Sequence, residues 1–242
     1  MKILYLYRDL MNLYGEYANI WILERSLREQ GLDVEVDHRT LGDKIDFSSC
    51  DFVYCGAGTE RSQKAALQHL NNFRSGLKEA ADRGTIALFT GNACDMMGKS
   101  IQGTDGREYR GLEILDFQVK EVPDKRFTGD AIASFGEIQQ PLVGFVNKCS
   151  EMKGVSHPLF EMKMGMGNMQ GDSGEGWRKG NFFGTHLIGP VLVKNPAFLS
   201  WLVQKIGLAC QQGFTVRPVC HEYEEKAYQT TYEALEQRRT GR

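Results

Sequence analysis

The chain has 242 residues, of which 41% are hydrophobic, so it can bury a sizeable core in one large or two small domains. Its formal net charge of −2 implies no general attraction to nucleic acid or to an anionic membrane surface. The sequence contains no run of about 18 apolar residues, so we expect no membrane span.

Six cysteines are scattered along the chain, and no two of them form a Cys-x-x-Cys pair. This spacing favours neither a zinc site nor a dense disulfide framework. We therefore expect no metal, no other cofactor and a reducing, cytoplasmic location. Residues 1–7 are too short and too quickly charged for a signal peptide, and they are typical of a first strand.

Strand and helix patterns alternate over the first ninety residues. Residues 17–30 carry apolar side chains at helical spacing, and residues 60–81 form a second, longer helical pattern. Short apolar or alternating runs predict strands at residues 2–7, 32–37, 51–55 and 85–90. This rhythm predicts an α/β fold with a doubly wound, mostly parallel sheet, whose sites lie at the carboxyl ends of the strands.

The second half of the chain changes character, and there we expect an added antiparallel or mixed section. Strands are predicted at residues 112–122, 127–134, 142–147 and 181–188. Residues 162–180 are rich in glycine and methionine and indicate an exposed loop, whereas residues 196–211 form an amphipathic helical pattern. The simplest organisation is one domain over residues 1–217, followed by a peripheral helix and frayed tail over residues 218–242.

The most informative segment is Thr85-Ile-Ala-Leu-Phe-Thr-Gly-Asn-Ala-Cys-Asp95. A buried strand that turns sharply through small residues into a helix is typical of the elbow where hydrolases and amidotransferases place their nucleophile. Backbone N–H groups near such a tip face the oxyanion. Here the tip residue is Gly91, and the nearest thiol, that of Cys94, comes one helical turn later.

Other segments carry a family resemblance that runs in order over nearly the whole chain. They are Asn12-Leu-Tyr-Gly-Glu-Tyr-Ala-Asn19, Gly56-Ala-Gly-Thr-Glu-Arg-Ser-Gln63, Gly111-Leu-Glu-Ile-Leu-Asp-Phe117, Arg126-Phe-Thr-Gly-Asp130, Val143-Gly-Phe145 with Asn147, Gly184-Thr185 through Gly189-Pro190, and Lys194-Asn-Pro196. Together they resemble the GatD family, the glutaminase subunits of lipid II isoglutaminyl synthase. These subunits are class I glutamine amidotransferases of the cobyric-acid-synthase type.

The resemblance implies the fold of the class I glutamine amidotransferases and a cytoplasmic subunit that hydrolyses glutamine. The ammonia would pass to an ATP-dependent, Mur-ligase-like partner, MurT. This partner would amidate the α-carboxyl of D-glutamate in the peptidoglycan stem peptide. We expect no nucleic acid partner and no membrane span.

Two positions of this sequence depart from the family pattern. The family elbow reads roughly Cys-Gly-Gly-Tyr-Gln, and an alignment without gaps places its cysteine on Gly91. The family histidine falls on Ile188, within Gly184-Thr-His-Leu-Ile-Gly-Pro190. A thioester mechanism needs a thiolate to attack the amide carbon and a histidine to protonate the leaving ammonia. Glycine and isoleucine can do neither.

A displaced dyad of Cys94 and His186 is the first alternative. The two residues are shifted by +3 and −2 from the family positions, which keeps each of them near the original face of its element. One helical turn is about 5 Å, however, and a misplacement of about 1 Å can already cost about 100-fold in rate. The second alternative is that Cys94 is a small buried residue and His186 a satisfied strand residue.

Three residues are candidates for substrate binding. Arg126 stands in the family's Arg-x-Thr-Gly-Asp setting, so the resemblance implies that its guanidinium binds the glutamine carboxylate. It could instead be a surface arginine paired with Asp124 or Asp130. Gly56 and Gly58 would frame the oxyanion-hole loop, whose backbone must come close to the substrate, or they could form a plain turn.

Three hypotheses therefore stay open. The chain is an active glutaminase subunit, a pseudo-glutaminase that binds or scaffolds a Mur-ligase-like partner, or an unrelated small-molecule binder. Ile188 would make the cleft more apolar, which suits binding better than hydrolysis. The residues favour the pseudo-glutaminase for mechanism, whereas the family resemblance favours the active enzyme.

Overall fold

The computed structural model describes residues 1–217 and 222–241. A six-stranded sheet in the order β13-β14-β4-β3-β1-β2 lies at its centre. All neighbouring strands in this sheet run parallel except the edge strand β13. Its strands are β1 (Lys2–Leu6), β2 (Glu35–Arg39), β3 (Phe52–Cys55), β4 (Ile86–Thr90), β13 (Trp177–Lys179) and β14 (Phe182–Thr185). The doubly wound, mostly parallel sheet expected from the sequence is thus confirmed.

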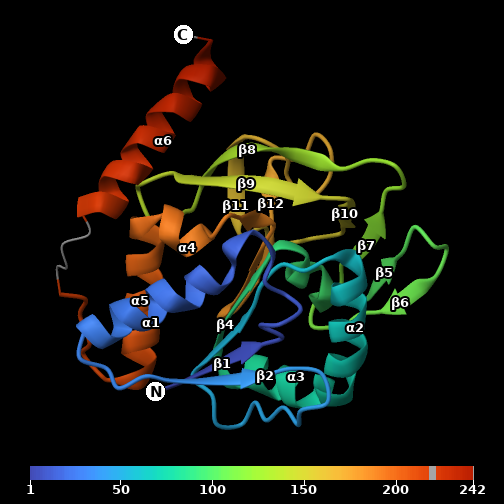
Figure 1. The fold of residues 1–242 in the computed structure, drawn as a ribbon, viewed down its shortest axis with the longest axis horizontal. Helices are drawn as coiled ribbons and strands as arrows, with labels where there is room; N and C mark the ends of the chain where they lie inside the picture. The colour runs from blue at the N-terminus through green and yellow to red at the C-terminus, as the bar shows by residue number, and fades with distance from the viewer. Residues whose placement is uncertain (218–221, 242) are drawn as a thin grey trace.

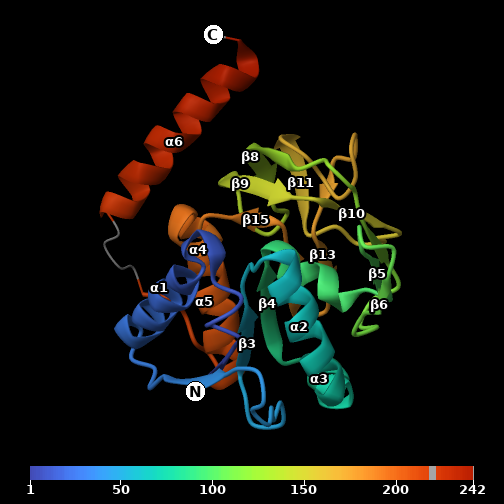
Figure 2. The ribbon, with the colours of Figure 1, turned by 45° about the vertical axis from the view of Figure 1, so that its right-hand side comes forward.

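Helices cover both faces of this sheet, as Figures 1 and 2 show. On one face lie α1 (Tyr17–Glu29), α4 (Val191–Lys194) and α5 (Pro196–Cys210), and on the other lie α2 (Glu60–Leu70) and α3 (Arg74–Arg83). Every residue of β3 and β4 is buried, since helices cover them from both sides. No helix in the described part of the chain is long and apolar enough to cross a membrane.

Two smaller sheets form the added section. One has the order β10-β7-β5-β6, and the other, fully antiparallel, has the order β12-β11-β8-β9-β15. Their strands are β5 (Ser100–Gln102), β6 (Glu108–Arg110), β7 (Gln118–Glu121), β8 (Phe127–Ser134), β9 (Leu142–Lys148), β10 (Ser150–Lys153), β11 (Phe160–Met164), β12 (Gly174–Glu175) and β15 (Leu187–Ile188). Only the β5–β7 pair runs parallel among the described pairs of the first sheet. The sequence prediction of an antiparallel or mixed section is therefore confirmed.

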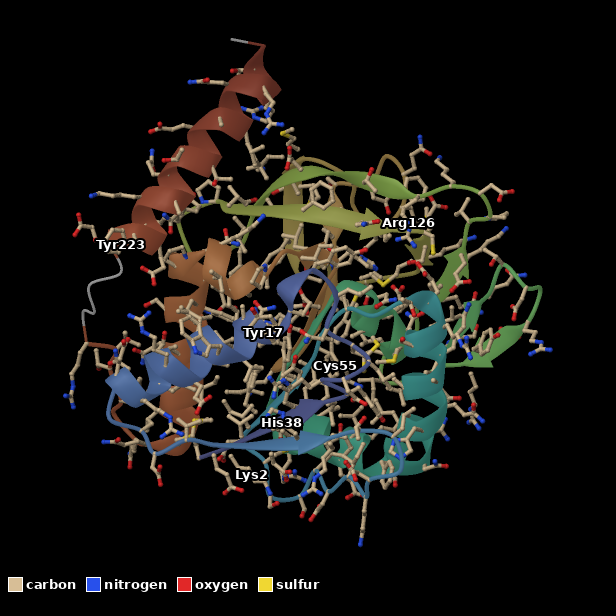
Figure 3. All side chains as sticks on the ribbon, viewed as in Figure 1. Lys2, Tyr17, His38, Cys55, Arg126 and Tyr223 are labelled. Atoms are coloured by element: carbon tan, nitrogen blue, oxygen red, sulfur yellow. The ribbon has the colours of Figure 1, made fainter. Side chains whose placement is uncertain are left out.

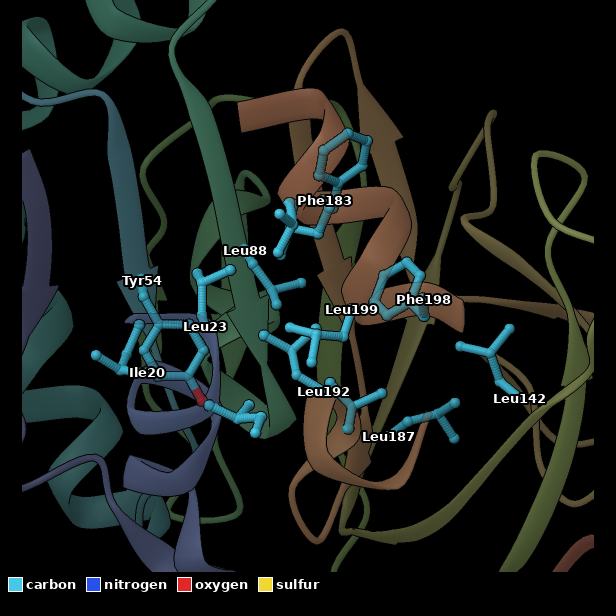
Figure 4. Packing of buried hydrophobic residues seen from close by; sticks show 14 of the residues in the cluster. Ile20, Leu23, Tyr54, Leu88, Leu142, Phe183, Leu187, Leu192, Phe198 and Leu199 are labelled. Atoms are coloured by element: carbon cyan, nitrogen blue, oxygen red, sulfur yellow. The ribbon is translucent and has the colours of Figure 1, made fainter. Parts of the chain in front are cut away.

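The apolar core fills the space between the central sheet and its helices. Figure 4 shows the α1 side, where Ile20 and Leu23 pack with Tyr54 and Leu88 of the sheet. Each fully buried side chain of this size stabilises the fold by about 1.5–3 kcal/mol relative to its exposed state. Because α1 and the strands are fixed by this core, the loops at the carboxyl ends of the strands are held in place.

Several predicted boundaries were wrong, and each error has a local cause. The predicted helix 60–81 is two helices, separated by the 3-10 turn η2 (Asn71–Phe73). The Asn71 side-chain amide donates to the carbonyls of Leu67 and Arg110, so it ties the end of α2 to β6. The predicted strand 32–37 is shifted to β2 by the turn that follows Gly31.

The largest error concerns residues 162–180, of which only residues 165–173 form the predicted loop. Residues 162–180 also contain the end of β11 together with β12 and β13, whose glycines allow the strands and turns to pack closely. The predicted strand 112–122 contains only β7, and the predicted strand 181–188 is divided between β14 and β15, which belong to different sheets. At the end of the chain, helix α6 (Glu222–Thr240) continues to residue 240, so the predicted tail is helical, with residues 218–221 and 242 outside the described part.

Candidate active site

The turn after β4 keeps the backbone of a nucleophile elbow without a nucleophile. Gly91 has φ +58°, a left-handed conformation that glycine adopts without strain. A Cβ atom added there would lie 2.4 Å from the Ala57 Cβ and 3.2 Å from the Ile188 Cγ2. The chain then continues as a 3-10 helix, η3 (Gly91–Met97). Ala57 and Ile188 therefore occupy the space that a side chain at the elbow tip would need.

A pocket of about 190 Å³ lies beside this tip. Its walls come from the loop between β1 and α1, which we call the first loop, and from the loop after β3, the elbow and the β9–β10 connection. The predicted residues Arg126 and Gly58 line it, whereas Gly56, Cys94 and His186 are not among its lining residues.

The structure brings the two members of the displaced dyad together. The Cys94 sulfur, an Asp95 carboxylate oxygen and a His186 ring nitrogen all lie within 4.8 Å of one another. Cys94 and His186 are nevertheless fully buried behind the pocket wall, and only Asp95 reaches the pocket. Burial, reinforced by the charge of Asp95, raises the pKa of the Cys94 thiol well above its usual value. A thiol with a raised pKa is a weak nucleophile, and Cys94 does not line the pocket from which a substrate could approach.

His186 belongs to a buried polar cluster. Its Nε2 lies 2.8 Å from Asp95 Oδ1, and its Nδ1 lies 3.4 Å from Glu175 Oε1. The second Asp95 oxygen accepts a hydrogen bond of 2.8 Å from Ser150 Oγ. Burial and the nearby Lys148 act to lower the pKa of His186, but Asp95 and Glu175 outweigh them and raise it. The His186 ring thus lies between two acidic side chains, one from the elbow and one from β12.

Sequence reasoning missed Asp95 and Glu175 as members of this cluster. Glu175 lies in the segment that was predicted to be an exposed loop, so nothing marked its side chain as buried. Asp95 was quoted as the last residue of the elbow segment and received no role of its own. The polar partner of His186 could have been sought among acids near the elbow, since a buried imidazole needs one.

The same donor set could in principle hold a metal ion, and its spacing decides against this. Two ligands bound to one tetrahedral zinc at about 2.0–2.1 Å stand roughly 3.3 Å apart. The Asp95 oxygen and the His186 nitrogen are 2.8 Å apart, which is a hydrogen-bond distance. The cluster therefore fits an ion pair better than a metal site.

Arg126 lies beside the end of β9, at the mouth of the pocket (Figure 3). Its guanidinium forms an ion pair with Glu60, and its Nη1 donates a hydrogen bond of 2.9 Å to Asn147 Oδ1. Neither Asp124 nor Asp130 is its partner in the structure, because Asp130 pairs with Arg238. A carboxylate ligand could accept two parallel hydrogen bonds from the Arg126 guanidinium only if it displaced Glu60.

The loop after β3 is held by close contacts. A Cβ at Gly56 would lie 2.7 Å from the Met11 carbonyl oxygen, and one at Gly58 would lie 2.4 Å from the Met11 sulfur. The Gly58 N–H donates to Asn92 Oδ1 at 2.9 Å, and Asn92 Nδ2 donates back to the Gly58 carbonyl. A backbone N–H that could face an oxyanion is therefore already bonded to the elbow.

A second group that sequence reasoning missed is Glu16, which is fully buried beneath the site. Its carboxylate accepts hydrogen bonds from Tyr54 and Thr90 and approaches the backbone N–H groups of Ala57 and Gly189. Burial raises the pKa of Glu16 to about 7, although these hydrogen bonds act to lower it. Glu16 thus connects the three segments that surround Gly91.

The elbow, the adjacent pocket and the central sheet define a class I glutamine amidotransferase domain. A glutamine amidotransferase from Thermotoga maritima superposes with a TM-score of 0.53 and 14% identity, covering 99% of this chain and 97% of that one. Another crystal structure of a glutamine amidotransferase gives a TM-score of 0.55 and 11% identity, covering 84% of this chain and 98% of that one. The fold expected from the sequence is confirmed by these neighbours.

The family follows from the sequence comparisons. A model of the CobB/CobQ-like glutamine amidotransferase domain matches residues 2–196. Lipid II isoglutaminyl synthase (glutamine-hydrolyzing) subunit GatD of Staphylococcus aureus (strain N315) is 31% identical over 240 residues, 97% of this chain and 96% of that protein. The GatD subunit of Streptococcus pneumoniae (strain ATCC BAA-255 / R6) is 24% identical, over 93% and 91% respectively. The chain belongs to the GatD family of the CobB/CobQ-like glutamine amidotransferases, as the resemblance predicted.

Proposed function

We propose that this chain is the GatD-like subunit of a cytoplasmic synthase that amidates the D-glutamate of the lipid II stem peptide. Its partner would be a Mur-ligase-like, MurT-type subunit. We further propose that the chain binds this partner without hydrolysing glutamine. Family membership supports the pathway and the partnership, since both GatD relatives are named as subunits of lipid II isoglutaminyl synthase.

One observation carries the second half of this proposal, namely the filled space at the elbow tip. Hydrolysis of glutamine through a thioester needs a sulfur atom at this tip, where it can reach the amide carbon. Gly91 supplies no side chain, and the space for one is occupied by the Ala57 Cβ and the Ile188 Cγ2. The loss therefore involves the shape of the site as well as its nucleophile, and the ligase would take ammonia from solution.

An active glutaminase with the displaced dyad is the second candidate. The 4.8 Å grouping of Cys94, Asp95 and His186 favours it. It would require η3 to move so that the Cys94 sulfur enters the pocket, and it would require the His186–Asp95 contact to open. The third hypothesis, an unrelated small-molecule binder that retains the site cleft, receives no support from the relatives, both of which are named as synthase subunits.

The experiment is an amidation assay with the purified chain and the MurT-type ligase from the same organism. The ligase complex is supplied with ATP, lipid II and either glutamine labelled with ¹⁵N in its amide or ammonium chloride. We expect amidation from ammonium, no transfer of ¹⁵N from glutamine and no release of glutamate. The chain alone, tested in parallel, should release no glutamate either.

Cys94→Ser is the matched variant for the second candidate. If the wild type releases glutamate and Cys94→Ser does not, the displaced dyad is active and the non-hydrolysing proposal is wrong. If the wild type transfers the label and Cys94→Ser does so equally, a different nucleophile is at work, and the proposal is again wrong. Absence of any complex with the ligase would contradict the proposed partnership.

A further inference from the structure

An exposed aromatic patch lies on the first loop and on α1. We define it as Leu13, Tyr14, Tyr17 and Trp21, whose exposed fractions range from 37% to 60%. Large exposed hydrophobic side chains are few in the described residues, and four of the seven belong to these nine consecutive positions. Tyr17 and Trp21 are four residues apart on α1, so they share one face of the helix (Figure 3 labels Tyr17).

The patch is also free of exposed charge along the chain. From Leu10 to Leu23 the only charged residue is Glu16, and its side chain is fully buried beneath the site. Surfaces that are rich in aromatic residues and depleted in charged ones are characteristic of the centres of protein interfaces. A contiguous apolar surface of this kind marks a contact with another macromolecule.

The patch continues into the mouth of the pocket. Leu13 and Tyr14 belong to both, and the Tyr14 hydroxyl accepts a hydrogen bond of 2.9 Å from Asn147 Nδ2 on the opposite wall. Tyr14 is held at φ +62°, a left-handed conformation that is costly for a tyrosine. Such strain persists only where the surrounding structure imposes it, and here it presents the ring at the pocket mouth.

We propose that the patch is the surface on which the ligase subunit of the synthase docks. This inference rests on the proposed function, which makes that subunit the partner. The relatives select this occupant, because both are named as subunits of a synthase, and a subunit needs an apolar face for the rest of its complex. The ligase would present an uncharged, apolar surface to Tyr17 and Trp21, with Trp21 as the main anchor.

Affinity measurements with the MurT-type ligase test the docking surface. Trp21→Ala and Tyr17→Ala should each weaken the complex about tenfold or more, as expected for aromatic anchors at the centre of an interface. Leu208→Ala is the matched control, because Leu208 is equally exposed at 51% but lies near the end of α5. It should bind like the wild type. Melting curves of all variants show whether the fold is kept.

Fluorescence gives a second readout that does not depend on a disruptive variant. Trp177 is fully buried and Trp201 is half-buried, so Trp21 is the tryptophan most accessible to acrylamide. In the free chain, the difference in acrylamide quenching between the wild type and the conservative variant Trp21→Phe gives the contribution of Trp21. Addition of the ligase should protect this component from the quencher.

Three outcomes would overturn the docking surface. The first is a wild-type complex that tolerates both alanine variants, which leaves the proposed function standing. The second is a dimer of the chain that Trp21→Ala dissociates while ligase binding is unchanged, which would assign the patch to a second copy. The third is a patch that binds lipid vesicles and not the ligase. If no ligase complex forms at all, the proposed function fails together with this inference.

Discussion

At the scale of single residues, the pocket is shaped by two small residues that fit each other, Gly91 and Ala57. Gly91 leaves a space at the elbow tip, and the Ala57 methyl group fills it. The two residues come from different loops, which Asn92 joins through its two hydrogen bonds to Gly58. The identity of residue 91 therefore depends on residue 57, and the two positions should be coupled energetically.

A double-mutant cycle tests this coupling. Gly91→Cys should lower the free energy of unfolding by about 1–3 kcal/mol, because the new Cβ meets Ala57 and the left-handed backbone disfavours a side chain. Ala57→Gly in the same chain should recover part of this loss. Urea unfolding of the two single variants and the double variant gives the interaction energy. Strictly additive effects would contradict the steric explanation.

Glu16 predicts a dependence of stability on pH. Its pKa is about 7 in the folded chain, against an ordinary value of 4.5 for an exposed glutamate. Between these values the folded state holds a proton that the unfolded state has lost, so stability should fall as the pH rises from about 4.5 to 7. The difference corresponds to roughly 3 kcal/mol at 1.36 kcal/mol for each unit of pKa.

Urea midpoints of the wild type and Glu16→Gln between pH 5 and pH 8 measure this effect. The neutral amide cannot ionise, so its stability should decline less over that range. Equal slopes for the two proteins would mean that Glu16 is ionised already at pH 5, and would contradict the raised pKa.

At the scale of elements, the buried cluster joins parts that are far apart in the sequence. Asp95 lies in η3, Glu175 in β12, and His186 between β14 and β15. Because β14 belongs to the central sheet and β15 to the five-stranded sheet, His186 stands where the chain crosses from one to the other. The ion pairs therefore fix the elbow against both sheets.

Removal of one partner should show how much this cluster contributes to the stability of the fold. Asp95→Ala leaves the Nε2 of the buried His186 ring without its acidic partner, and we expect a loss of about 3–5 kcal/mol in the free energy of unfolding. Asp95→Asn should lose less, since its oxygen can still accept from Ser150 or His186. Calorimetric melting of the two variants distinguishes them. A loss below about 1 kcal/mol for Asp95→Ala would contradict a structural role for this contact.

The sequence predicted elements well where one local pattern decides them. The buried strands β3 and β4 and the amphipathic helices α1 and α5 were found close to their observed bounds, because periodicity reports burial directly. The β11–β13 segment was missed, because its glycines serve close packing and not flexibility. At the site, Gly91, Ile188 and Arg126 could be located by motif. The contact of Ala57 with the elbow tip and the acidic partners of His186 could not be located by motif, since these contacts join residues far apart in sequence.

At the scale of the whole molecule, the C-terminal helix approaches the end of α1, where Arg25 lies 3.6 Å from Glu224, but its apolar side chains pack elsewhere. Helix α6 packs on β8 and β9, where Tyr228 and Leu235 contact Ile132 and Val143 (Figure 1). The patch belongs to the first loop and α1. The division into a domain over residues 1–217 and a peripheral segment over 218–242 stays a prediction, and truncation of the chain can test it.

A chain truncated after residue 217 should still fold cooperatively and still bind the ligase. It would lose the burial of Tyr228 and Leu235, so we expect its melting temperature to fall by several degrees, at about 2–4 °C for each kcal/mol. Scanning calorimetry and the affinity assay above provide the two measurements. A truncated chain without a cooperative transition would show that α6 is part of the domain.

Ala57 also bears on the direction in which this site can change over evolutionary time. A cysteine introduced at position 91 would meet the Ala57 methyl group, and a histidine introduced at position 188 would have no thiol beside it at the elbow tip. For the non-hydrolysing subunit that we propose, neither substitution alone would therefore create a glutaminase. An evolutionary path toward hydrolysis would have to change residue 57 before or together with residue 91.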